Sequence, residues 1–134
     1  MPGATRFLSR LLGCYCLIMA VVMLLRRAAT IAAITALLHD PALLYALGII
    51  LIFAGLAMVL VHNRWSGRRV ALIVTLIAWL TLLKGLLLIC GAPGQIADLY
   101  LRALQYAHYY SIYALATLVL GIYLTFAGFR AAAE

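Results

Sequence analysis

Acidic residues are the scarcest class in this chain, which holds three Asp and Glu against ten Lys and Arg, with only 10% of its 134 residues charged. A soluble domain is about 25% charged and about 45–50% apolar, whereas 69% of this chain is hydrophobic. The composition therefore excludes an ordinary soluble domain and a disordered chain, and it indicates a membrane protein. Four helices of about 20 residues would use most of the length and leave only short connections.

Motifs of enzyme chemistry are also missing. The sequence has no glycine-rich phosphate loop, no Cys-x-x-Cys pair, no paired buried carboxylates and no Ser/His/Asp set. Cys14 and Cys16 fall in the first apolar stretch and Cys90 ends the third, so neither a disulfide nor a chelating pair is expected. We therefore expect a protein that is not an enzyme, with no catalytic residue and no cofactor.

The three histidines are the remaining candidates for metal or haem chemistry. His62 ends the second apolar stretch, while His39 and His108 flank stretches on the opposite side of the membrane. This separation excludes a three-histidine site. A two-histidine site from His39 and His108, with Asp40, stays open beside plain hydrogen bonding at the membrane surface, and no metal site is predicted.

Predominantly apolar stretches of spanning length occur at residues 7–25, 41–61, 70–90 and 109–129. Only helices satisfy their own backbone hydrogen bonds one segment at a time inside a bilayer. The first stretch is not a signal peptide, because Arg26-Arg27 stands where a small-residue cleavage site should be. The sequence therefore predicts an all-α integral membrane protein with four transmembrane helices in one membrane domain.

The connections between these stretches differ in character. Residues 63–69 form a polar turn that can only join antiparallel neighbours. Segments 28–38 and 95–107 are longer, and in the second one apolar residues recur at helical spacing opposite polar ones, which is typical of an amphipathic helix lying in the membrane surface. Residues 45–48 and 113–116 match weakly at an offset of 68, which suggests an internal repeat.

Basic residues in the short connections predict the orientation of the spans. Six arginines lie near the termini and the 63–69 turn, against three at the other end, so the positive-inside rule places both termini in the cytoplasm. No arginine cluster alternates with exposed aromatics, so nucleic acid is not an expected partner. The six arginines near the termini and the turn are Arg6, Arg10, Arg64, Arg68, Arg69 and Arg130, and the three at the other end are Arg26, Arg27 and Arg102.

Small residues recur every seven positions along the spans, close to two helical turns. Such stripes let helix backbones approach closely in lipid, and they predict a left-handed antiparallel four-helix bundle. A dimerisation face is the alternative use of the same stripes. The predicted packing residues are Gly13, Gly48, Gly55, Ala78, Gly85, Ala114, Gly121 and Gly128.

Apart from Arg10 near the start of the first span, Lys84 is the only full charge inside a predicted span, and it lies six residues before Cys90. A charge at the bilayer centre costs at least about 2.5–3.5 kcal/mol, so we expect Lys84 to point toward the nearer surface and to pair with Asp40, which also caps the second span. The alternative is a polar ligand or ion site in the outer leaflet, formed by Lys84 with Asp40, Asp98 and His108.

Tyrosines gather before and at the start of the fourth span. Tyr and Trp prefer the headgroup level of a membrane, so an aromatic belt is the plain interpretation. The alternative is a groove for a lipid tail or a quinone ring beside His108 and Lys84. The residues that would line it are Tyr106, Tyr109, Tyr110 and Tyr113.

Three stretches of the chain resemble short, uncharacterised bacterial four-span membrane proteins. They are Asp40-Pro41, His62-Asn63-Arg64-Trp65 and residues 79–85, so the resemblance covers about residues 40–90. It implies a location in the bacterial inner membrane and supplies no activity.

These observations leave three functions open. The first is a non-enzymatic membrane protein that acts through helix–helix contacts, as a homo-oligomer or as a small accessory subunit of a membrane complex. The second is a minimal transporter or channel formed by oligomerisation, and the third is a lipid- or quinone-binding membrane protein. The expected partners are the lipid bilayer and other membrane proteins, or a second copy of the chain.

Overall fold

The computed structural model describes residues 3–63, 65 and 69–130, and every regular element in that part of the chain is helical. Four helices are long and apolar enough to cross a membrane, as the sequence predicts. They are α1 (Gly3–Leu25), α3 (Pro41–Val61), α4 (Arg69–Cys90) and α6 (Tyr110–Arg130). The shorter helices are α2 (Arg27–Leu38), α5 (Pro93–Asp98) and the π-helix η1 (Leu99–Ala103).

Local sequence explains where the helices begin. Asp40 has an extended backbone and its carboxylate accepts hydrogen bonds from the first turn of α3, while Pro41 occupies the first helical position. Helix α1 starts earlier than the predicted residue 7, since Thr5 and Ser9 bury their polar side chains against other parts of the fold. The Ser9 hydroxyl donates to the Leu124 carbonyl at 2.7 Å, which ties α1 to α6.

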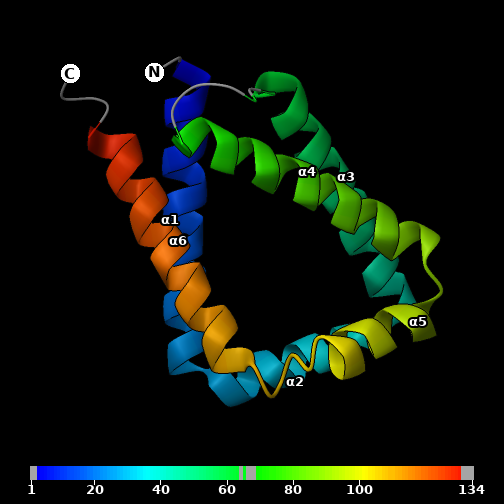
Figure 1. The fold of residues 1–134 in the computed structure, drawn as a ribbon. Helices are drawn as coiled ribbons and strands as arrows, with labels where there is room; N and C mark the ends of the chain where they lie inside the picture. Colours follow the sequence, from blue (N-terminus) through cyan, green and yellow to red (C-terminus); the bar gives the residue numbers. More distant parts are fainter. Residues whose placement is uncertain (1–2, 64, 66–68, 131–134) are drawn as a thin grey trace.

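The long helices pack as two antiparallel pairs, α1 with α6 and α3 with α4 (Figure 1). Glycines make the close approach possible. A Cβ added at Gly13 would lie 2.5 Å from the Thr125 nitrogen, and one at Gly55 would lie 2.5 Å from the Leu82 nitrogen. All eight predicted packing residues, from Gly13 to Gly128, are buried inside the chain. The small-residue stripes therefore pack against other helices of the same chain.

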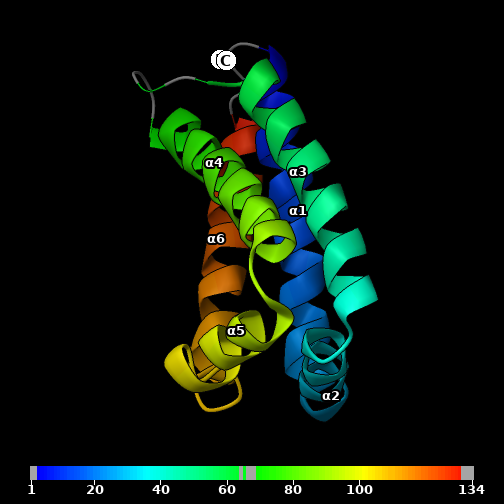
Figure 2. The ribbon, with the colours of Figure 1, turned by 90° about the vertical axis from the view of Figure 1, so that its right-hand side faces the viewer.

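The two pairs meet at one end of the molecule, where α1 begins, α6 ends and α3 connects to α4 (Figure 1). We call this the terminal end. A buried cluster of Leu8, Val70, Val74 and Leu124 joins α1, α4 and α6 there. At the opposite end, here the α2/α5 end, α2 and α5 bridge the pairs, and Ile96 of α5 packs with residues of α2, α3 and α4. Between these ends the pairs diverge, so the spans outline an open frame (Figures 1 and 2).

Segment 95–107 is less regular in the structure than the continuous helix that its sequence pattern predicts. Helical structure covers Pro93–Asp98 and then η1, where the Leu104 amide donates to the Leu99 carbonyl at 2.8 Å. The π-turn is followed by Gln105, whose φ of 44° is the left-handed conformation that side chains disfavour. The helix therefore stops at Ala103, short of the predicted end at residue 107.

Candidate functional site

A cavity of about 160 Å³ lies at the α2/α5 end, where α2, α3, α4 and η1 meet. Most of its wall is apolar, with Ile34, Leu38, Leu44 and Leu88 among the lining side chains. Lys84, Tyr100 and Tyr106 complete the lining, and Lys84 is the only charged residue among the described ones that line it. The cavity thus combines an apolar wall with one cation and two phenols.

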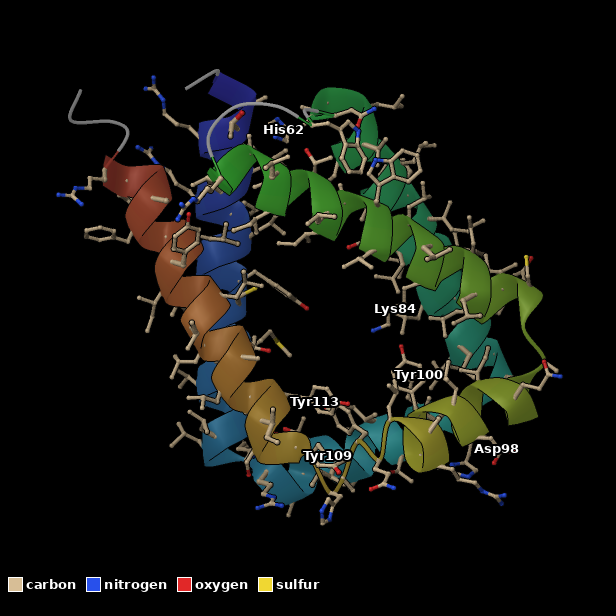
Figure 3. The ribbon with its side chains drawn as sticks, viewed as in Figure 1. His62, Lys84, Asp98, Tyr100, Tyr109 and Tyr113 are labelled. Atoms are coloured by element: carbon tan, nitrogen blue, oxygen red, sulfur yellow. The ribbon has the colours of Figure 1, made fainter. Side chains whose placement is uncertain are left out.

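Lys84 leaves α4 toward the space between the two helix pairs (Figure 3). Its Nζ lies 5.5 Å from the centre of the Tyr100 ring, which comes from η1 on the other side of the cavity. A cation over an aromatic face gains about 0.5–1 kcal/mol at an exposed site, and Lys84 is exposed in this structure. This contact directs the ammonium toward Tyr100 but does not neutralise its charge.

The predicted ion pair between Lys84 and Asp40 is wrong. The Asp40 carboxylate instead accepts hydrogen bonds from the backbone of Ala42 at 3.0 Å and of Leu43 at 3.1 Å. The other acid at this end, Asp98, pairs with Arg102 at 3.1 Å, and both of these side chains are exposed. Among the described residues no carboxylate contacts Lys84, because helix capping and a local i, i+4 pair occupy both acids.

The histidines at this end also have other contacts. The His108 ring meets Tyr109 edge-on, with centroids 4.9 Å apart, and His39 Nδ1 donates to the Thr35 carbonyl at 2.7 Å. The predicted polar set of Lys84, Asp40, Asp98 and His108 is therefore not assembled by the contacts of the described residues. Within the same residues no group of three His, Cys, Asp or Glu could hold a metal ion.

Three tyrosines form a cluster next to the cavity. Tyr106 stacks on Tyr113 with centroids 5.4 Å apart and meets Tyr110 edge-on at 5.7 Å. The buried Tyr110 donates its hydroxyl to the Met23 carbonyl at 2.8 Å, and Tyr113 donates to the Leu104 carbonyl at 3.1 Å. Only Tyr106 of the four predicted groove tyrosines lines the cavity.

Burial raises the pKa of the Tyr106 phenol above its ordinary value, and the neighbouring Tyr110 and Tyr113 raise it further. The phenol is therefore neutral at physiological pH and keeps its proton for hydrogen bonding. Tyr109 takes no part in this cluster, since its ring is partly exposed beside His108. Tyr106, Tyr110 and Tyr113 thus form a packed cluster, whereas Tyr109 lies outside it and contacts His108.

Tyr100 is the site residue that sequence analysis does not single out. It belongs to the apolar face of the 95–107 pattern, where it is indistinguishable from a residue that merely faces lipid. The π-turn changes the register of the backbone at this point, so the direction of Tyr100 does not follow from α-helical spacing. Irregular backbone of this kind is found disproportionately at functional sites.

Two open clefts border the space between the helix pairs. One, of about 700 Å³, lies between α4 and α6 and is almost wholly apolar, with Arg69 at its terminal end. The other, of about 690 Å³, lies between α1, α2 and α3 and includes Arg26 and Asp40. Residues that line the first cleft include Ile73, Ile112, Ala116 and Val119.

Three threonines of the spans satisfy their hydroxyls within their own helices. The hydroxyls of Thr75, Thr81 and Thr117 each donate to the carbonyl four residues earlier, at 2.7 to 2.9 Å. Such back-bonding satisfies the hydroxyl within its own helix. Figure 3 shows the Lys84 side chain directed toward the space between the helix pairs, and Arg69 lines the α4/α6 cleft at the terminal end.

Comparisons with protein-family models, with curated proteins and with solved structures found no match. The resemblance of residues 40–90 to bacterial four-span proteins therefore stays a prediction. The function has to be inferred from the fold and from the cavity around Lys84.

Proposed function

We propose that this is a non-enzymatic, multi-pass membrane protein that binds a lipid-like amphiphile between its two helix pairs. The observation that carries the proposal is the divergence of the pairs, which leaves an apolar cleft of about 700 Å³ along α4 and α6. Ligand pockets typically have volumes of about 300–1,000 Å³ and mostly apolar walls. In a bilayer such a cleft takes up hydrocarbon, because water finds no hydrogen-bond partners on its walls.

An amphiphile fits this space better than a purely apolar molecule. The long cleft supplies hydrocarbon contacts, whereas the cavity at the α2/α5 end supplies Lys84 and the phenols of Tyr100 and Tyr106. A molecule with an apolar tail and a polar end would satisfy both regions at once. A quinone and a lipid share this pattern, and the charge of Lys84 favours the lipid.

The proposed setting is the bacterial inner membrane, with both termini and the 63–69 turn in the cytoplasm. The excess of arginine near these segments supports this orientation. Helices α2 and α5 would then lie along the outer surface as interfacial helices, and the crossings within each pair would be left-handed, as seven-residue spacing of small residues favours. The Lys84 cavity would face the outer leaflet.

Native mass spectrometry tests the proposal directly. The protein purified in mild detergent should carry a lipid-sized adduct that survives repeated detergent exchange. Ala116→Phe places a large ring in the α4/α6 cleft and should remove most of the adduct. Ala57→Phe, on an exposed position of α3 that does not line this cleft, is the matched control. A wild-type protein without adduct, or equal retention by both variants, would contradict the proposal.

A transmembrane helix is the second candidate occupant of the same opening. The α4/α6 cleft presents large exposed side chains, such as Leu115 and Val119, to whatever fills it. A second copy or a larger complex would make the protein a homo-oligomer or an accessory subunit, and the same spectra would show the corresponding mass. The transporter alternative has less support, because the hydroxyls of Thr75, Thr81 and Thr117 bond to their own helices.

A further inference from the structure

The two acids among the described residues leave Lys84 without a countercharge. Asp40 caps α3, Asp98 pairs with Arg102, and neither contacts Lys84. The third acid, Glu134, lies outside the described residues. Within the described part of the chain, the cavity around Lys84 therefore receives no carboxylate.

We propose that Lys84 binds the phosphate of an anionic phospholipid whose acyl chain runs along α4 into the α4/α6 cleft. This inference rests on the proposed function and names the class of amphiphile. An ammonium group in a largely apolar cavity gains most from an anion that brings its own hydrocarbon. A lipid supplies both parts in one molecule.

The spacing along α4 matches the dimensions of a lipid. Ile73 lines the α4/α6 cleft and Lys84 lines the cavity, eleven residues further along the same helix. Eleven residues are close to three helical turns, so the two side chains share one face of α4, about 16 Å apart along its axis. One leaflet of the hydrocarbon core is about 15 Å thick. A phosphate at Lys84 thus allows its acyl chain to reach Ile73.

The cavity itself has the size of a headgroup fragment. Its volume of about 160 Å³ is enough for a phosphate group and is far smaller than the α4/α6 cleft of about 700 Å³. Tyr106 lines the same wall with a neutral phenol that can donate a hydrogen bond, and Tyr100 holds the ammonium in place from the side. The wall therefore offers donors and no competing anion.

The site should distinguish anionic from zwitterionic headgroups. In a zwitterionic lipid the phosphate already has an ammonium partner, whereas in phosphatidylglycerol it does not. Arg27, over the Tyr110 ring, is a further cation at this end and disfavours an additional positive headgroup. We expect about a tenfold preference for the anionic lipid, the size of one charge-assisted hydrogen bond.

The experiment is a competition in native mass spectrometry. The delipidated full chain in detergent is mixed with equal amounts of phosphatidylglycerol and phosphatidylethanolamine that carry identical acyl chains. Wild type and Lys84→Arg should retain the anionic lipid, and Lys84→Met should lose the preference while it still binds lipid. Arg102→Gln is the matched control, because it removes an exposed cation at the same end that already has a carboxylate partner. Circular dichroism checks that each variant is folded, and Lys84→Gln replaces any Lys84→Met protein that is not.

The possible outcomes separate this inference from the proposed function. Equal retention of the two lipids by wild type overturns the anionic site and leaves amphiphile binding intact. A preference that persists without Lys84, or that disappears in Arg102→Gln, assigns it to general surface charge and also overturns the site. Binding of neither lipid overturns both proposals. Inorganic phosphate alone should give no adduct, since it lacks the chain that occupies the cleft.

Discussion

The ammonium group of Lys84 lies 5.5 Å from the centre of the Tyr100 ring, and this contact links a membrane-spanning helix to a π-turn. The two residues belong to different elements, α4 and η1, and both line the same cavity. The π-turn sets the direction of Tyr100, and the ring in turn limits where the lysine can point. An irregular connection thus positions the charge that the proposed function uses.

Tyr100 variants test the cation–π contact. Tyr100→Leu should destabilise the protein by about 0.5–1 kcal/mol, the usual value for an exposed cation–π pair, whereas Tyr100→Phe keeps the ring and should be close to wild type. Thermal unfolding in detergent, followed by circular dichroism, measures the difference. The Leu variant should also have no additional effect in a Lys84→Met background. An undiminished effect there would show that Tyr100 contributes only through apolar packing.

Asp40 variants separate a helix cap from an ion pair. Because the carboxylate accepts from the Ala42 and Leu43 amides, Asp40→Ser should retain the cap and most of the stability. Asp40→Ala should lose about 1 kcal/mol, the usual value of an N-cap. The same unfolding measurement compares the two variants. Equal destabilisation by Ser and Ala would mean that the charge of Asp40, rather than its capping geometry, stabilises α3.

The sequence predicts the membrane-spanning helices of the fold better than it predicts the contacts of the site. Spanning length and hydrophobicity are local properties, so residues 41–61 are predicted with the same bounds as α3. The glycine stripes are periodic and predict close helix packing. They do not say which helices pair, and the separation into α1 with α6 and α3 with α4 depends on tertiary contacts that no single stretch encodes.

The wrong partner for Lys84 shows why the site is harder to predict. The scarcity of acids on that side of the membrane favours Asp40 as the partner, and the same residue stands in a capping position before Pro41. One carboxylate cannot fill both roles, and the cap is satisfied within the next three residues. Local hydrogen bonds form at little entropic cost and so prevail over a distant ion pair.

A buried histidine joins the two helix pairs at the terminal end. His62 Nδ1 lies 3.2 Å from the Thr5 hydroxyl of α1, and Nε2 lies 3.2 Å from the Ala71 carbonyl of α4. Since a carbonyl only accepts, Nε2 donates and Nδ1 accepts from Thr5 in the neutral ring. This arrangement connects the end of α3 to both of the other elements, and Figure 3 shows His62 between them.

A double-mutant cycle measures this junction. His62→Ala and Thr5→Val should each destabilise the protein by about 1–3 kcal/mol, because each leaves a buried polar group without its partner. The coupling between them should be at least about 0.5 kcal/mol. Asn63→Ala, at an exposed neighbour of His62, is the control and should be near neutral. Strictly additive effects would indicate that the histidine packs against α1 without a specific hydrogen bond.

Cys90 reports the orientation of the spans. It is exposed at the α2/α5 end, where α4 stops, whereas Asn63 is exposed at the terminal end. If the termini are cytoplasmic, a membrane-impermeant maleimide should label Cys90 in intact spheroplasts. In a Cys90→Ser background, Asn63→Cys should be labelled only after permeabilisation. The reverse pattern would show that the positive-inside rule fails for this chain and that the Lys84 cavity faces the inner leaflet.

Glycine substitutions test whether the small-residue stripes pack helices within one chain or form contacts between two copies of the chain. In Gly55→Ala the new Cβ would lie 2.5 Å from the Leu82 backbone nitrogen, so α3 and α4 must separate, and we expect a loss of about 1–3 kcal/mol. Gly94→Ala in α5 meets no atom within 4 Å and should be neutral or slightly stabilising. Unfolding in detergent and native mass spectrometry are run on both variants. A Gly55 variant that keeps wild-type stability but changes its oligomeric mass would show that this stripe serves a contact between chains instead.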